Sequence, residues 1–164
     1  MLAIKYGLRS IIRSHSIFSP FTTITTLPTG QSAANAWQKS CYYKINFTIS
    51  ENAAVFDAVQ RFSAFNIGAL ITVDSDKKIS GVITERDYVN KIALLGRNSK
   101  ETFCKEIATA SPNLITAQIS DSVDTCMEKM LLSDIRHLPL LDGDECVGLV
   151  SVKDLVKEVL RENR

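Results

Sequence analysis

Hydrophobic and polar positions recur along the chain in two similar copies. Sliding the sequence by 68 residues superposes apolar positions of the first copy on those of the second, and a turn one residue shorter reduces the later offset to 67. The matched pairs include Val55 with Val123, Phe62 with Met130, Leu70 with Leu138, Gly81 with Gly148, Thr84 with Ser151 and Asp87 with Asp154. Self-similarity at a fixed spacing predicts an internal structural repeat.

Each copy predicts the same order of elements. A short strand is expected near Phe47–Ile49 and again near Leu114–Ala117, followed by a helix whose apolar positions have helical spacing. Two apolar runs, Gly68–Val73 and Ile79–Ile83 in the first copy, flank a polar turn and favour paired strands. A last helix begins at Thr84 or Ser151. The pattern therefore predicts two tandem βαββα units.

A unit of this size cannot bury enough apolar surface alone, so the two copies are expected to pack as one pseudo-symmetric module. The fold class is α/β (α+β). We place the first repeat at residues 45–95, a polar linker at 96–112 and the second repeat at 113–164.

Residues 1–40 differ from the rest in composition. Positions 1–50 contain no Asp or Glu, and on a helix Lys5, Arg9 and Arg13 line one stripe while Ile4 and Leu8 lie on another. This pattern is typical of a mitochondrial presequence, which would be disordered and direct the protein to the matrix. A disordered basic tail and a plastid address are the alternatives. We expect this segment to stand outside the fold.

Charge and cysteine content exclude several classes of function. Beyond residue 50 the chain has 14 Lys and Arg against 18 Asp and Glu, a net charge of −4 that argues against nucleic-acid binding. No apolar run approaches the ~18 residues of a membrane span. The four cysteines lack metal-binding spacing. Cys126 and Cys146 are interpreted as buried small hydrophobes, and Cys104, in the polar linker, as the candidate reactive thiol.

Chemistry concentrates at two strand-to-helix junctions with the pattern Gly-x-x-(Thr/Ser)-x-x-Asp, residues 81–87 and 148–154. One interpretation is a capping box, in which the hydroxyl and the acid satisfy free backbone N–H groups. The other adds a ligand, because a helix N-terminus suits phosphate and a carboxylate can accept both hydroxyls of a ribose. Two such junctions at matching positions of a repeat favour the ligand-binding interpretation more strongly than a single junction would.

With these junctions, the segments Asn66–Leu70 and Ile135–Pro139 make the chain resemble a pair of CBS domains, also called a Bateman module, over about Phe47 to Glu162. The likeness extends to the small mitochondrial CBS-pair proteins of plants and to bacterial stand-alone pairs. The resemblance implies two clefts between the copies, which bind adenine nucleotides or adenosyl compounds in some members. It also implies a homodimer and a regulatory link to a redox enzyme such as thioredoxin.

Carried onto this sequence, the resemblance implies two clefts of unequal quality. In the first, Asp87 would bind a ribose, Thr84 and Arg136 a phosphate, and Leu138 and Pro139 would flank the adenine. The complete first set is Thr84, Asp87, Thr116, Arg136, His137 and Pro139. The second set is Thr48, Gly68, Ala69, Ser151 and Asp154. It has Ile71 in place of a proline and no basic residue matching Arg136, so we expect it to be the weaker site.

The sequence therefore predicts a non-catalytic regulatory module that needs no cofactor and takes an adenosine-containing ligand. The alternative is a structural adaptor of a mitochondrial complex with empty clefts. His137 has no nucleophile in a recognisable arrangement and is interpreted as a cleft or core histidine. Glu85 and Arg86 are interpreted as a solvated pair on an exposed helix.

Overall fold

The computed structural model describes residues 31–162. The first repeat contains β1 (Thr48–Ser50), α2 (Val55–Phe65), β2 (Ala69–Val73), β3 (Ile79–Thr84), α3 (Glu85–Tyr88) and the π-helical turn η2 (Val89–Ala93). The second contains β4 (Ala117–Gln118), α4 (Val123–Leu132), β5 (His137–Asp142), β6 (Glu145–Ser151) and α5 (Val152–Glu162). Two 3₁₀ turns, η1 (Cys41–Lys44) and η3 (Cys104–Glu106), and the helix α1 (Ala33–Gln38) complete the described part. None of its helices is long and apolar enough to cross a membrane.

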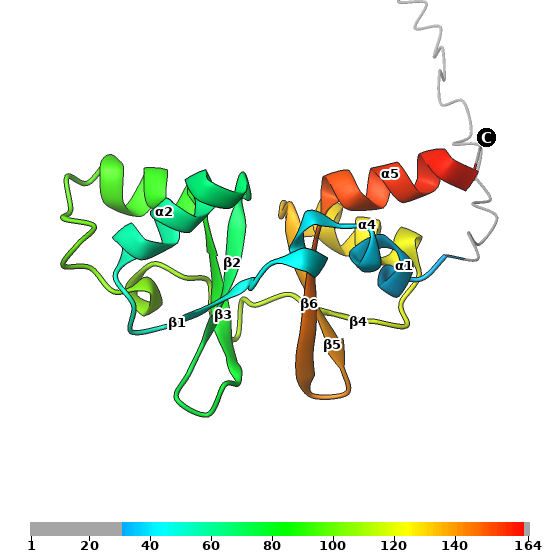
Figure 1. Ribbon diagram of the computed structural model, residues 1–164, viewed down its shortest axis with the longest axis horizontal. Helices are drawn as coiled ribbons and strands as arrows, with labels where there is room; N and C mark the ends of the chain where they lie inside the picture. Colours follow the sequence, from blue (N-terminus) through cyan, green and yellow to red (C-terminus); the bar gives the residue numbers. More distant parts are fainter. Residues whose placement is uncertain (1–30, 163–164) are drawn as a thin grey trace, which may run out of the picture.

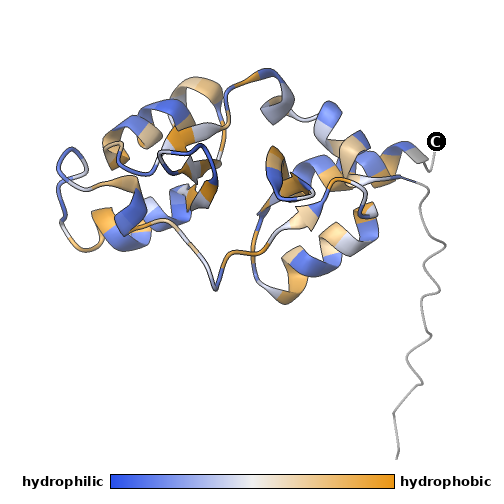
Figure 2. Cartoon of the chain, turned by 90° about the horizontal axis from the view of Figure 1, so that it is seen from below, coloured by the Kyte–Doolittle hydropathy of each residue, from blue (hydrophilic) through white to orange (hydrophobic). Residues whose placement is uncertain are grey.

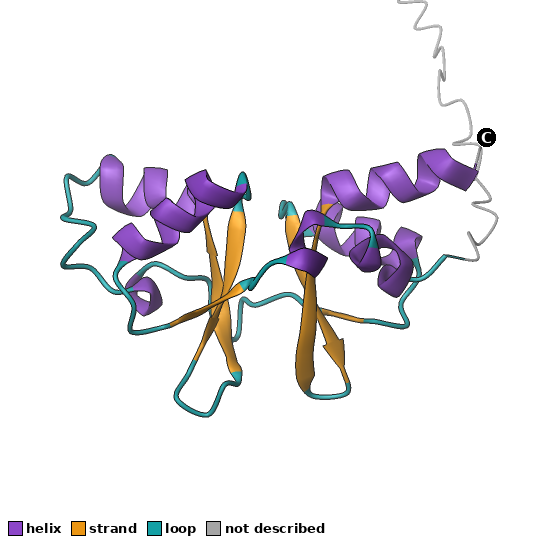
Figure 3. Ribbon diagram, viewed as in Figure 1, coloured by secondary structure: helices purple, strands orange, loops and turns teal. Residues whose placement is uncertain are grey.

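The two repeats have the same sheet topology. In each, the short first strand pairs in parallel with the middle strand, which pairs antiparallel with the last, giving the orders β1-β2-β3 and β4-β5-β6. The sheets lie next to each other at the centre, with the helices on their outer sides (Figures 1 and 3). The predicted βαββα order is therefore confirmed, with the first strands starting one and three residues later than expected.

The core forms because each helix has one apolar face. Figure 2 shows the helices carrying both hydrophobic and hydrophilic residues, as helices on the outside of a fold do. In α2 the buried positions are Val55, Ala58 and Phe62, at helical spacing. Leu149 of β6 belongs to the same buried cluster as the first repeat's strands, so the hydrophobic core continues across the boundary between the repeats.

Residues 1 to about 40 were expected to stand outside the fold, and for residues 33–40 this expectation is wrong. Helix α1 packs on the second repeat, and Ala33 and Ala36 are buried in that repeat's core. Small side chains one helical turn apart allow the close approach, and the backbone N–H of Ala33 donates to the Asp121 carbonyl at 2.8 Å. The predicted import segment otherwise lies outside the described residues and stays a prediction.

The linker backbone lies directly against Gly81 of β3. A Cβ added at Gly81 would lie 2.7 Å from the backbone oxygen of Thr109, which accepts a hydrogen bond from the Val82 N–H at 2.9 Å. We expect Gly81→Ala to lower the free energy of unfolding by about 2 kcal/mol, as overpacking against backbone usually does. Urea unfolding followed by circular dichroism measures this, and an unchanged midpoint would mean that the linker moves aside freely.

Candidate functional site

Both predicted strand-to-helix junctions form reciprocal capping boxes. The Thr84 N–H and hydroxyl donate to Oδ2 of Asp87 at 3.0 and 2.6 Å, and the Asp87 N–H donates back to the Thr84 hydroxyl at 3.1 Å. Ser151 and Asp154 repeat the arrangement at 2.9, 2.6 and 3.3 Å. The structural interpretation of these residues is thus confirmed, and any ligand must bind to aspartates that already cap helices.

Asp87 keeps some capacity for a further hydrogen bond. Its Oδ2 accepts from Thr84, and its Oδ1 accepts from the Lys91 ammonium at 2.7 Å. A carboxylate offers about four acceptor positions, so one position on Oδ1 is left beside Lys91. The side chain of Asp87 is 12% exposed, which gives a solute access to that oxygen.

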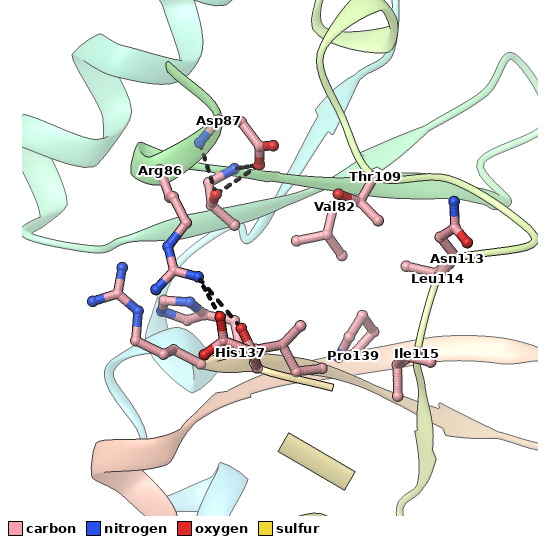
Figure 4. A pocket seen from close by; sticks show the side chains of 13 residues that line it. Val82, Arg86, Asp87, Thr109, Asn113, Leu114, Ile115, His137 and Pro139 are labelled. Atoms are coloured by element: carbon pink, nitrogen blue, oxygen red, sulfur yellow. Dashed lines mark hydrogen bonds and ion pairs between the residues drawn. The ribbon is translucent and has the colours of Figure 1, made fainter. Parts of the chain in front are cut away.

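The first cleft lies between the repeats and has two chemically different ends. It encloses about 200 Å³. Figure 4 shows Leu114 and Ile115 with the uncharged polar Asn113 at one end, Arg86 and Asp87 at the other, and Val82, Thr109 and Pro139 between them. Thr84, Arg136 and His137 line it as well, so five of the six residues predicted for this cleft are brought together. A cleft with one apolar and one polar end suits a ligand of the same division.

Thr116 is the predicted residue that does not line the first cleft described here. Its carbonyl instead accepts a hydrogen bond from Lys129 of α4 at 3.2 Å. Thr116 lies immediately before β4, which begins at Ala117. The preceding residues that line the cleft are Thr109 of the linker and, from the start of the second repeat, Asn113, Leu114 and Ile115.

Arg86 is a cleft residue that sequence reasoning missed. Its guanidinium crosses from the first repeat to the second and donates to the carbonyl and carboxylate oxygens of Asp134, at 3.4 and 3.2 Å (Figure 4). The expectation of a solvated pair with Glu85 is therefore wrong for Arg86. Its side chain is nevertheless half exposed, so periodicity alone had no reason to assign it to a cleft.

The second cleft is larger, about 380 Å³, and carries more positive charge than expected. Gly68, Ser151 and Asp154 line it as predicted, whereas Thr48 and Ala69 do not. Thr48 bonds Asn46, and Ala69 is fully buried in the sheet. Arg136 reaches this cleft too, together with Lys153 and Lys157. The position that matches Arg136 in the repeat is Gly68, as expected, but α5 supplies Lys153 and Lys157 from outside that segment.

His137 lines both clefts. Burial lowers the pKa of its imidazole to about 4, with a smaller contribution from the positive charge of Arg136. Its ring packs edge-on against Tyr42, with centroids 6.0 Å apart. The histidine is therefore a neutral wall of both clefts at neutral pH, in line with its interpretation as a cleft or core residue.

Cys104 is not the reactive thiol that its polar surroundings suggested. It is fully buried at the start of η3, and burial raises its pKa to about 11. A thiol with so high a pKa is a poor nucleophile at neutral pH. Cys126 is fully buried, as interpreted, and Cys146 is partly buried.

Comparison with known proteins agrees with this geometry. The family model described as "CBS domain" matches residues 44–94 and 104–161. The mitochondrial CBS domain-containing protein CBSX3 of Arabidopsis thaliana is 34% identical over 82% of this chain. This chain spans 62% of that protein's length and 19% of the Arabidopsis protein CBSCBSPB2, to which it is 30% identical.

Solved structures give the same result. A protein with CBS domains from Burkholderia ambifaria is 38% identical, with a TM-score of 0.74 over 82% of this chain and 97% of its own. A CBS domain protein from Pyrobaculum aerophilum, described as complexed with AMP, has the same fold at 21% identity, with a TM-score of 0.69 over 80% of this chain and 97% of its own. The chain therefore belongs to the CBS-domain family, as a tandem pair.

Proposed function

We propose that this chain is a non-catalytic regulatory module that binds an adenosine-containing ligand, an adenine nucleotide or an S-adenosyl compound, in its first cleft. The division of that cleft into a charged end and an uncharged, largely apolar end carries the proposal. Adenine would lie against Pro139 and Ile115, and a ribose hydroxyl would reach the remaining acceptor position of Asp87. The AMP complex of the P. aerophilum protein supports the same ligand class.

The phosphate contact in this proposal differs from the sequence expectation. The Thr84 hydroxyl is already engaged in the capping box, so it is not free to donate to a phosphate. Arg86 and Arg136 both line the cleft, and guanidinium groups bind phosphate oxygens with planar, charge-assisted hydrogen bonds. Arg86 would then exchange Asp134 for the phosphate. The cleft is smaller than the ~300–1,000 Å³ usual for ligand sites, so part of the ligand would extend to its mouth.

Isothermal titration of the full chain with AMP tests the proposal. We expect saturable binding that weakens by about 10- to 100-fold in Asp87→Ala and in Arg136→Ala, the usual loss for charged hydrogen bonds. Asp76→Ala, which removes an exposed carboxylate from the β2–β3 turn, is the matched control and should bind as wild type does. Asp87→Ala also loses a cap worth about 1 kcal/mol, so binding is measured well below its melting temperature.

The absence of binding to AMP, ADP, ATP and S-adenosylmethionine at millimolar concentration would contradict the proposal. It would favour a structural adaptor with empty clefts. Large apolar side chains exposed on α4, on α5 and in the turn after η2 are available for such a role and for the homodimer that the family implies; they are Leu94, Leu95, Leu131, Leu132, Val156 and Leu160.

We also propose that the protein acts in mitochondria. The basic, acid-free N-terminal segment supports this, as does the likeness to the mitochondrial Arabidopsis protein. We further propose that the regulated partner is a redox enzyme such as thioredoxin. This proposal rests on the resemblance to plant mitochondrial CBS-pair proteins alone.

A further inference from the structure

The two clefts differ in which of their polar groups are already hydrogen-bonded to other parts of the chain. The chain between α1 and β1 passes from the second repeat to the first, drawn in blue to cyan in Figure 1. On the way, the Ser40 hydroxyl donates to Oδ2 of Asp154 at 3.0 Å. Ser40 is 4% exposed and Asp154 is 6% exposed, so this contact is closed to solvent. Asp154 is the repeat counterpart of Asp87, the residue that would bind ribose in the first cleft.

Tyr42 continues the same segment to the opposite wall of the second cleft. Its hydroxyl accepts a hydrogen bond from the Gly68 N–H at 3.3 Å, and its ring is 2% exposed. Gly68 lines the wall that the first repeat contributes and belongs to the second set of residues implied by the resemblance. Together, Ser40 and Tyr42 bond to both walls of the cleft.

Further contacts hold this segment in place. Lys39 forms an ion pair with Glu158 at 2.6 Å, and the Glu158 side chain is 1% exposed. The Trp37 ring lies so close to Gly148 that a Cβ there would be 2.8 Å from it. The segment is thus fixed to the second repeat on the N-terminal side of the cleft.

In the first cleft the described hydrogen bonds of the aspartate come from its own repeat. Oδ1 of Asp87 accepts a hydrogen bond from Lys91, which is 42% exposed and also donates to the Ile107 carbonyl. Thr109 of the linker and Asn113 of the second repeat line the cleft wall. The repeat-related aspartates therefore bond a partly exposed lysine in one cleft and a buried serine in the other.

We propose that residues 40–42 are a built-in competitor for the polar groups of the second cleft, whose lining includes Cys41 and Tyr42. Ser40 bonds the capping oxygen of Asp154 and Tyr42 takes the Gly68 N–H, so that, although the cleft is open, only the first of the two clefts accepts ligand. This inference rests on the proposed function for the identity of the ligand. It makes the stoichiometry one ligand per chain.

Amide hydrogen exchange of the full chain tests the Tyr42 contact without any ligand. Replacing Tyr42 by Phe keeps the ring and removes the acceptor of the Gly68 N–H. We expect exchange at Gly68 to become at least about tenfold faster, since an unpaired amide near the surface loses its protection. Tyr43→Phe is the matched control, because Tyr43 is 51% exposed, and it should leave Gly68 unchanged. Equal exchange in all three proteins would overturn the docking of Tyr42.

Titration with AMP tests the consequence for binding. The wild-type chain should bind one AMP, and Tyr42→Ala, which frees the Gly68 N–H, should bind two, while Tyr43→Ala keeps one. Ser40→Ala is a milder variant in case Tyr42→Ala fails to fold, and it should add a weaker second binding event. Emission of Trp37, the single tryptophan, should shift to longer wavelength as the segment is released.

Two results would overturn the inference: two AMP per wild-type chain with unchanged Trp37 emission, or one AMP in both Tyr42→Ala and Ser40→Ala. A wild-type chain that binds no AMP would contradict the proposed function instead. In that case the hydrogen-exchange experiment still decides whether Tyr42 bonds the Gly68 N–H in the wall of the second cleft.

Discussion

The free energy of unfolding should fall by about 2 kcal/mol more between pH 7 and pH 4.5 in the wild-type chain than in a His137→Asn variant, as a pKa difference of this size requires. In the folded chain the pKa of His137 is about 4, chiefly because of burial, against an ordinary value of 6.5. Between these two values the unfolded chain binds more protons than the folded chain. Acid therefore favours unfolding: the stability contribution is fully present above about pH 6.5 and is lost as the pH falls towards 4.

The comparison with His137→Asn is needed because carboxylates also titrate in acid. The variant loses the ring that packs on Tyr42, so its stability is expected to be lower at every pH. Only the slope of stability against pH is diagnostic. Chemical unfolding at four pH values between 7 and 4.5 gives that slope. Identical slopes in the two proteins would mean that the imidazole is solvated in the folded chain and is not a buried wall of the clefts.

The repeat explains why most of the fold could be predicted from sequence. Many apolar positions in one copy have an apolar counterpart in the other, such as Val55 with Val123 and Leu70 with Leu138, so the two copies predict the same elements. The family resemblance, and not the repeat, brought Thr84, Asp87 and Arg136 into one predicted cleft. It was wrong for Thr116 and for its repeat counterpart Thr48, neither of which lines its cleft.

The features that were missed lie outside the repeat. Residues 33–42 have no counterpart in the second copy, and their lack of acids matches a targeting segment, so composition could not indicate that Ser40 and Tyr42 enter a cleft. Arg86 is a surface residue of α3 by pattern, and only the position of Asp134 in the other repeat shows that it spans the cleft. Contacts between distant segments depend on three-dimensional placement, which local periodicity does not encode.

Leu149→Ala should lower the free energy of unfolding by about 3–4 kcal/mol, within the range for removing a buried leucine side chain. Leu149 is fully buried on β6, in register with Pro139 on β5, yet it packs in the cluster built mainly by the first repeat. Its truncation would leave a cavity at the boundary between the repeats, which holds the two walls of the clefts together. Urea unfolding followed by Trp37 fluorescence and by far-ultraviolet circular dichroism measures the loss.

Leu160→Ala, at a leucine 60% exposed on α5, is the matched control and should change stability by no more than about 0.5 kcal/mol. A loss below about 1 kcal/mol in Leu149→Ala would mean that the site collapses around the missing atoms, contrary to the close packing usual in a core. The repeats would then be held together mainly by the chain segments that cross between them.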